Sequence, residues 1–492
     1  MTSEIDSQYE RPAAPLGTPL YLVGVLLLLV LAYTTFGVEI EPFWVLLAVP
    51  VVLLLPVLVR KFPLFLMVAM VYVGSFKTLG AVGVSVMDPT LLTALLLYAA
   101  VLLQVLVLAL SDRGLRLRDL FAGQMGGVSA FGLLLLIIAV SYLYTPAPGI
   151  GGEKVLKLVA FDVPIFLAPL ILLRTHRDVR QLLLLCMAGS LVLACRTVYR
   201  VLHPTAEVLL GLQDPTEIAE GLLTGAAALL ALYYPFPEKR LFRVALIGCL
   251  VVLTCGTTAS LSRSAIVSLL LVAAVSLIFL RHIPTTLSRR AILIAVGAVI
   301  VTVAVASVWL RGMPATYSKF AVKATELTLT LEGMTPGGTA GQRYSFAESA
   351  WHAFLSKPLL GWGAGGWSTL WHYSDERVLK YPHNFVLEIA AEQGLAGLAA
   401  LALLLLAMLR ACAKVLRGQE NQFVFIVPVV ALSLMGNAVT GQVEARDMWF
   451  WCGTLFALAR MASMNTVPAT NRPGLCADVS GWPTSYPAPH SL

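Results

Sequence analysis

The sequence predicts an all-α membrane protein whose chain crosses the bilayer about 12–14 times. Hydrophobic residues make up 58% of the 492 residues and charged residues only 12%, which is about half the charged share of a soluble protein. Apolar runs of about 17–25 residues, long enough to cross a hydrocarbon layer of about 30 Å, recur along the whole chain. These observations predict one polytopic domain.

The apolar runs place the spans in order along the chain, with charged residues, glycine and proline between them. The predicted spans are residues 18–36, 43–59, 62–79, 91–110, 129–145, 155–173, 179–198, 217–235, 242–259, 264–280, 291–309, 384–409, 423–440 and 447–461. The membrane domain is thus predicted over residues 18–463, with a polar tail of residues 1–17 before it. Residues 464–492, rich in Pro, Ser and Thr, are predicted to form a disordered tail.

Basic residues predict the orientation. With both tails in the cytoplasm, Lys and Arg gather in alternate short loops, as the positive-inside rule requires. These loops carry Arg60, Lys61, Arg113, Arg116, Arg118, Arg174, Arg177, Arg180, Lys239, Arg240, Arg243, Arg281, Arg289, Arg290, Arg410, Lys414 and Arg417. The long segment 310–381 then lies outside the cytoplasm.

Loop sizes limit the function. The cytoplasmic loops are too short for a nucleotide-binding domain, and no phosphate-binding glycine loop follows a strand. No basic segment is long enough to bind a nucleic acid. The seven cysteines lack metal spacing, and the predicted outer loops hold no carboxylate pair with metal spacing, so we expect no metal or cofactor. Any chemistry should therefore use a substrate in the outer leaflet.

His383 is the strongest candidate for a catalytic group. Pro382 precedes it, so a helix should begin at His383 or Asn384, with Asn384 as the N-cap. The start of such a helix favours an anion, and histidine can act as a general base near neutral pH. The alternative is that His383 is an interfacial residue that only caps the helix.

The helix after His383 carries a polar stripe and two glycines. Asn384, Glu388 and Glu392 follow one another at intervals of four residues and share one side. A carboxylate inside a span is costly unless it is paired or functional, and Arg263 or Arg446 is the expected partner of Glu392. The small residues Gly394 and Gly397 are expected to allow close helix packing.

Arginine and tryptophan complete the set of candidate binding residues. Five arginines lie at the predicted outer ends of spans or in the long loop, and their planar donor forks suit phosphate. They are Arg196, Arg200, Arg263, Arg343 and Arg446. The alternative is that they extend to lipid head groups. Trp362, in the glycine-rich segment 361–367, could stack on a sugar ring or anchor the loop at the membrane interface.

At this point the residues resemble a family. His383-Asn384, nine further residues, Gly394, two residues and Gly397 resemble the signature of bacterial O-antigen ligases. The preceding Arg343, Trp351 and the segment 358–363 resemble the domain that these ligases share with O-antigen polymerases and bacterial protein O-oligosaccharyltransferases, over residues of about 180–460.

The resemblance implies a glycosyltransferase of GT-C-type architecture in the bacterial inner membrane, with its active site facing the periplasm. The implied donor is a glycan on undecaprenyl pyrophosphate, and the implied acceptor is a hydroxyl of a glycan or glycolipid such as a lipid A–core sugar. The reaction would be inverting and independent of metal. The resemblance places the arginines on the pyrophosphate and His383 near the acceptor hydroxyl. We predict that His383 and Arg263 are catalytic, and that substrate is bound by Arg196, Arg200, Arg343, Asn384, Glu392 and Trp362.

Other functions stay open. A polymerase would add the chain to another lipid-linked repeat, and Arg200, ten residues and Gly211 match one spacing described for polymerases. A protein O-oligosaccharyltransferase would use a protein acceptor. A polysaccharide transporter predicts mid-membrane charges in two matching halves, whereas the polar residues here cluster at the outer face. A non-catalytic scaffold would leave the arginines and the Glu stripe unexplained.

Overall fold

The structure, a computed structural model, describes a little over half of the chain. The described residues are 59, 62–76, 89–110, 121, 123–202, 240–259, 297, 300–305, 308, 339–370, 381–417 and 426–465. The tail of residues 1–17, the predicted spans 18–36, 217–235 and 264–280, and the C-terminal tail beyond Asn465 lie outside these residues. Within the described part, helices and short connections make up the chain and no strand occurs.

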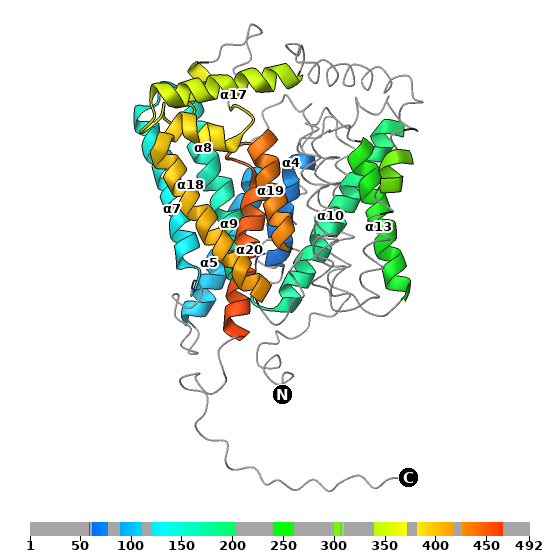
Figure 1. The fold of residues 1–492 in the computed structure, drawn as a ribbon. Coiled ribbons are helices and arrows are strands. Elements are labelled where there is room, and N and C mark those ends of the chain that lie inside the picture. The colour runs from blue at the N-terminus through cyan, green and yellow to red at the C-terminus, as the bar shows by residue number, and fades with distance from the viewer. Residues whose placement is uncertain are drawn as a thin grey trace, which may run out of the picture.

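The helices follow the chain in this order (Figure 1). They are α4 (Pro63–Phe76), α5 (Pro89–Leu110), α7 (Met125–Ser141), η1 (Tyr142–Tyr144), α8 (Pro148–Lys157), η2 (Leu158–Asp162), α9 (Val163–Leu172), α10 (His176–Leu202), α13 (Arg240–Ala259), α17 (Thr339–Ser356), η5 (Gly366–Thr369), α18 (Phe385–Arg417), α19 (Ile426–Thr440) and α20 (Arg446–Asn465). The elements labelled α are α-helices, and η1 and η5 are short 3-10 helices. Element η2 is a single π-helical turn that joins α8 to α9.

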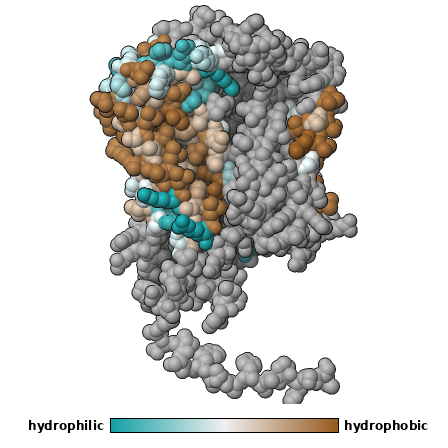
Figure 2. All heavy atoms as spheres, viewed as in Figure 1, coloured by the Kyte–Doolittle hydropathy of each residue, from teal (hydrophilic) through white to brown (hydrophobic). Residues whose placement is uncertain are grey.

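The helices confirm the predicted class of all-α polytopic membrane protein. Among the described residues, five helical stretches are long and apolar enough to cross a membrane. They are Thr90–Val107, Met125–Tyr144, Pro148–Leu172, His176–Tyr199 and Phe385–Arg417. Figure 2 shows hydrophobic side chains gathered in a band on this face of the molecule, with hydrophilic side chains above and below it. Such a band is the surface that a bilayer covers.

Two predicted boundaries differ from the structure in ways that matter for the site. The span predicted at 155–173 begins at Pro148, because α8, η2 and α9 form one continuous helical stretch. That stretch therefore takes Lys154 into the bundle. The segment 310–381, predicted as a long loop, contains the 18-residue helix α17.

Helix α17 lies across one end of the bundle, while the other long helices run along it (Figure 1). We call this end the α17 end. Helix α18 begins there beside α17 and packs along α7 and α20. At its other end, Lys414 donates to the backbone oxygen of Gly123, close to where α7 begins. Helices α7 and α18 are thus antiparallel neighbours along the length of α7.

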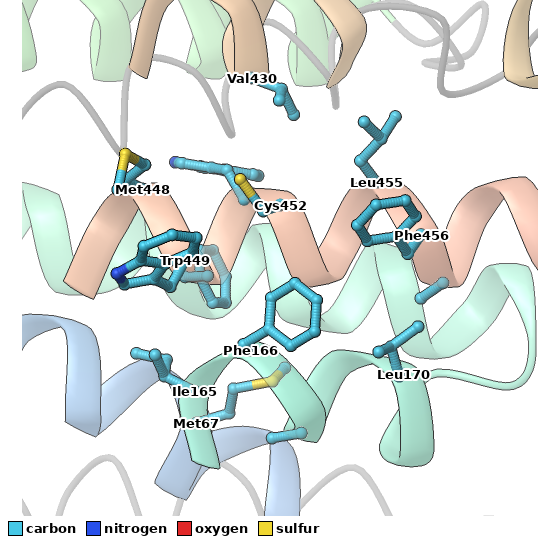
Figure 3. Close-up of a cluster of buried hydrophobic side chains, with 14 of the residues drawn as sticks. Met67, Ile165, Phe166, Leu170, Val430, Met448, Trp449, Cys452, Leu455 and Phe456 are labelled. Atoms are coloured by element: carbon cyan, nitrogen blue, oxygen red, sulfur yellow. The ribbon is translucent and has the colours of Figure 1, made fainter. Parts of the chain in front are cut away.

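The core towards the other end is aromatic and lies between α7, α9 and α20. Figure 3 shows Phe166, Trp449 and Phe456 packed with aliphatic and sulfur-containing side chains. The rings of Phe131 and Phe166 are stacked with centroids 3.9 Å apart, and Phe166 meets Phe456 edge-on at 6.0 Å. Arg460 closes this core because its guanidinium donates to the backbone oxygens of Leu170 and Leu173, at the end of α9.

Candidate functional site at the α17 end

The start of α18 is fixed by Asn384. Its side-chain oxygen accepts hydrogen bonds from the backbone N–H groups of Val386 and Leu387, each at 3.0 Å. These are two of the donors that a helix start leaves without partners. The helix itself runs from Phe385, so the predicted N-cap at Asn384 is confirmed.

His383 adopts a backbone conformation that is uncommon for a residue other than glycine. Its φ of 56° lies in the left-handed region, and it is the one described non-glycine residue with a positive φ. Such a conformation costs about 1–3 kcal/mol and persists only where the surroundings hold it, which is common at functional sites.

Aromatic rings surround the His383 imidazole. The ring of Phe346, from α17, stacks on it with centroids 5.8 Å apart, and Tyr381 meets it edge-on at 4.6 Å. Phe346 in turn contacts the fully buried Trp367 of η5. Phe346 and Trp367 form a small core with Ala350, Ala353 and Ala391, separate from the aromatic core of the bundle. The rings hold His383 at the half-buried junction of α17 and α18.

Below His383, Glu388 and Glu392 of α18 form a buried ion triad with Lys154 of α8. The Lys154 ammonium lies 2.7 Å from Glu388 Oε1, and it donates to both carboxylate oxygens of Glu392 at 2.7 and 2.8 Å. All three side chains are at most 3% exposed. The sequence predicted Arg263 or Arg446 as the partner of Glu392, but the structure pairs it with Lys154. Both carboxylate oxygens are thus used inside the protein.

The turn between α19 and α20 supplies a further hydrogen bond to the triad. The backbone N–H of Val443 donates to Glu388 Oε2 at 2.9 Å. Next to it, Glu444 lies 3.5 Å from Lys157, which also pairs with Glu153 at 2.8 Å. Burial raises the pKa of Glu444, and the neighbouring Lys157 and Lys154 lower it in part. Charged groups from α8, α18 and the α19–α20 turn therefore meet at one place.

Helix α18 breaks at Gly394, and the glycine-rich segment fills the break. The backbone of Gly394 (φ 63°, ψ −151°) lies in a region that is essentially restricted to glycine. Four backbone hydrogen bonds join the segment 358–363 to α18 on either side of the break. Before the break, Trp362 N donates to Ala391 O at 2.9 Å and Gly363 N to Glu392 O at 2.8 Å. After it, Leu395 N donates to Pro358 O at 2.7 Å and Ala396 N to Leu359 O at 3.2 Å. Gly394 thus allows the helix to break and the backbone of residues 358–359 to approach closely. The sequence had predicted that it allows close packing between helices.

The docked segment is also joined to the corner between α7 and α8. The Thr145 hydroxyl donates to the backbone oxygen of Ala364 at 2.7 Å. The Gln393 amide donates to the Ser141 hydroxyl at 3.3 Å, directly beside the break in α18. Residues far apart in the chain therefore join the docked segment and the break in α18 to the α7–α8 corner.

Trp362 has structural contacts on several sides. Its indole N–H lies 3.0 Å from both the backbone oxygen of Ala353 and the Ser356 hydroxyl, at the end of α17. The Lys357 ammonium lies 3.8 Å from the centre of its ring. These contacts anchor the docked segment to α17. The two roles predicted for Trp362, stacking on a sugar ring and anchoring at the membrane interface, stay predictions.

The described arginines lie in different parts of the bundle. Arg343 is exposed on α17, three residues before Phe346. Arg196 lies near the end of α10, where it donates to the backbone oxygen of Ser75 at 3.4 Å. Helix α10 packs against α4 and α13, on the side of the bundle away from α7 (Figure 1). Arg263 and the side chain of Arg200 lie outside the described residues.

Fold and site define an α-helical, multi-pass membrane protein with a histidine held at the junction of a surface helix and a broken span. The family model described as O-antigen ligase matches residues 247–402 of this chain. This match is consistent with the O-antigen ligase superfamily, which the motif around His383 predicted. The matched segment includes α17, the glycine-rich segment and the first half of α18. A comparison with curated proteins gives no significant match.

Lys154 is the functional candidate that the sequence analysis missed. It lies outside the residues that the family model matches, and 238 residues separate it from Glu392. One signal was present in the sequence. Lys154 stands at the start of an apolar run, and the carboxylates at 388 and 392 needed a buried cation.

Proposed function

We propose that the protein is a membrane glycosyltransferase that moves a glycan from undecaprenyl pyrophosphate to an acceptor hydroxyl, for which we favour a lipid A–core sugar. The reaction would take place at the periplasmic face of the bacterial inner membrane, at the α17 end. The family match supports an enzyme of the O-antigen ligase or polymerase type. The basic residues 410, 414 and 417 on α18 favour placing the opposite end in the cytoplasm.

The observation that carries this proposal is the placement of His383. Its left-handed backbone and its aromatic neighbours hold the imidazole beside the membrane bundle at the start of α18. An imidazole at this place is suited to accept the proton of an acceptor hydroxyl. The buried triad below it uses Glu388 and Glu392 internally, so these carboxylates would position α18 rather than contact substrate.

In the proposed step, the acceptor oxygen attacks the anomeric carbon of the donor from the side opposite the pyrophosphate. A bond forms between that carbon and the acceptor oxygen, and the bond to the pyrophosphate oxygen breaks with inversion. His383 takes the acceptor proton, and undecaprenyl pyrophosphate leaves with the electron pair. Fixed cations can stabilise the charge on the leaving group, so the step would need no metal.

We assign the phosphate contacts to arginine. Arg343 lies one helical turn from Phe346, whose ring stacks on His383, so its guanidinium can reach the same region. Arg196, Arg200 and Arg263 remain proposed donor contacts, and Arg263 would also assist catalysis. Asn384 caps α18 with its side-chain oxygen, and its amide nitrogen would be the part that meets substrate. Trp362 would bind a sugar only through the ring face that Lys357 does not cover.

The test is transfer by purified variants with the undecaprenyl-pyrophosphate glycan and an acceptor glycolipid. His383→Ala should lose about 100- to 10,000-fold in transfer rate, the usual contribution of a general base. His352→Ala is the matched control, because His352 is an exposed histidine on the neighbouring helix α17. Equal activity of the two variants would remove His383 from the reaction.

A ligase and a polymerase differ in the acceptor, and deletion of the gene in its native host separates them. Loss of a ligase should leave long glycan on the lipid carrier and unmodified acceptor. Loss of a polymerase should leave single repeats on the acceptor. We favour the ligase because every fixed position of the motif from His383 to Gly397 matches the ligase signature.

A further inference from the structure

Helix α17 has three distinct sides along its length. Phe346, Ala350 and Ala353 are buried and recur at intervals of four and three residues, so they form the side that packs on the protein. Part of the remaining surface is polar: Glu348, His352 and Ser356 are exposed and follow one another at intervals of four. Glu348 lies at the border of this polar strip, four residues from Tyr344 and seven from Leu355.

The third side is apolar and exposed. Tyr344, Trp351 and Leu355 share it, because they are seven and four residues apart. Their exposed fractions are 70%, 49% and 54%. A helix that only covered the bundle from the water side would present polar residues on both exposed sides. One exposed side is instead polar and the other is aromatic and aliphatic.

The apolar side continues into a surface that belongs to the membrane. Leu359 and Leu360 follow α17 after Lys357 and Pro358 and are 69% and 59% exposed. The Tyr144 hydroxyl donates to the backbone oxygen of Leu360 at 2.6 Å, which joins this segment to the end of the apolar stretch Met125–Tyr144. The adjacent Leu143 is 80% exposed. Exposed apolar side chains therefore run from the span onto the segment that follows α17.

We propose that α17 is a membrane-surface helix. Its partner is the lipid bilayer, with Tyr344, Trp351 and Leu355 seated at the boundary between head groups and acyl chains, and with Glu348, His352 and Ser356 facing water. The direction of the helix agrees, because α17 lies across the bundle and hence along the membrane plane (Figure 1). Aromatic residues favour this depth, and a helix with one apolar and one polar side lies in the interface. This inference does not depend on the proposed reaction.

The lipid-facing and site-facing residues share one helix. Phe346, on the buried side of α17, stacks on His383, while Trp351 on the apolar side would contact lipid. The depth of α17 at the membrane surface would thus set the position of the Phe346 ring, which stacks on His383.

The test is quenching of Trp351 fluorescence by brominated lipids. The full-length protein and Trp351→Phe are reconstituted into vesicles whose phosphatidylcholine carries bromine near the head-group end of the chain, near its methyl end, or not at all. The difference between the two proteins reports Trp351 alone. We expect its emission to fall most with bromine near the head groups, and to be little affected by aqueous acrylamide.

The matched control is Trp367→Phe, since Trp367 of η5 packs beneath the buried side of α17 and is 0% exposed. Its difference signal should not respond to either brominated lipid. Three outcomes for Trp351 would overturn the proposal. They are quenching by acrylamide alone, which places it in water; no quenching by any reagent, which places it against protein; and strongest quenching near the methyl end, which places it deep in the bilayer.

Discussion

Different interactions stabilise the two ends of the bundle: ion pairs and hydrogen bonds at the α17 end, and packing of apolar side chains towards the other. At the α17 end, the interior contains the Lys154 ion triad, a broken helix and a segment joined by backbone hydrogen bonds. Towards the other end, the interior consists of rings and aliphatic side chains around Phe166. The α17 end depends on each polar group keeping its partner, whereas the aromatic core depends on filled volume.

This difference decides how each end responds to substitution. A buried charge that loses its partner keeps the full cost of being removed from water. A buried ring that is removed leaves a cavity, but helices within a membrane gain little from the hydrophobic effect because lipid is as apolar as the core. We therefore expect the polar end to be the more sensitive of the two.

The largest effect should come from Lys154→Met. The substitution removes the ammonium that lies 2.7 Å from an oxygen of each carboxylate, so Glu388 and Glu392 stay buried without a counter-charge. It should destabilise the protein by about 3–5 kcal/mol. Lys157→Met is the control at the partly exposed edge of the cluster, with an expected loss of less than about 1 kcal/mol. Thermal unfolding in detergent measures both. The triple variant Lys154→Met, Glu388→Gln, Glu392→Gln should recover much of the loss. Similar melting of the two single variants would contradict the comparison.

Phe166→Ala should come next. The ring is fully buried and contacts Phe131 and Phe456. Its removal should cost about 3 kcal/mol, the lower end of the range for soluble cores, because only packing is lost. Leu136→Ala, at a position 59% exposed on the lipid side, should leave the unfolding temperature nearly unchanged. A loss for Phe166→Ala that exceeds that of Lys154→Met would reverse the proposed ranking.

The third substitution is Gly394→Ala, at the break in α18. The backbone conformation alone should cost about 1–3 kcal/mol, and the added Cβ would lie 2.6 Å from the backbone oxygen of Pro358. Gly132→Ala is the control, because a Cβ there meets nothing within 4 Å and an alanine favours the helix. We expect opposite shifts in unfolding temperature. Stabilisation by both changes would show that the break in α18 is not required.

The fold class and the start of α18 could be predicted because they depend on local sequence. Apolar runs determine which segments cross a membrane. Asn384 caps α18 through N–H groups only two and three residues away. The motif from His383 to Gly397 identified the superfamily for the same reason, since its fixed positions lie within one short segment.

The partners across the site could not be predicted because they join distant parts of the chain. The sequence offered several cations for Glu392, and only the folded helices decide that α8 brings Lys154 to it. Gly394 and Gly397 were interpreted as a packing face because that pattern is common in membrane helices. The docking of residues 358–363 onto the break depends on the path of the whole connection from α17 to α18.

The single π-helical turn Leu158–Asp162 sets the phase between the two halves of one membrane crossing. Each residue of an α-helix advances by about 100° around the axis, and a π-turn inserts about one residue. Side chains after the turn are thus rotated by about that angle relative to those before it. The Tyr98 hydroxyl of α5 holds the turn through the backbone oxygen of Val159. One continuous stretch of chain can therefore aim Lys154 at α18 from one azimuth and Phe166 at α7 and α20 from another.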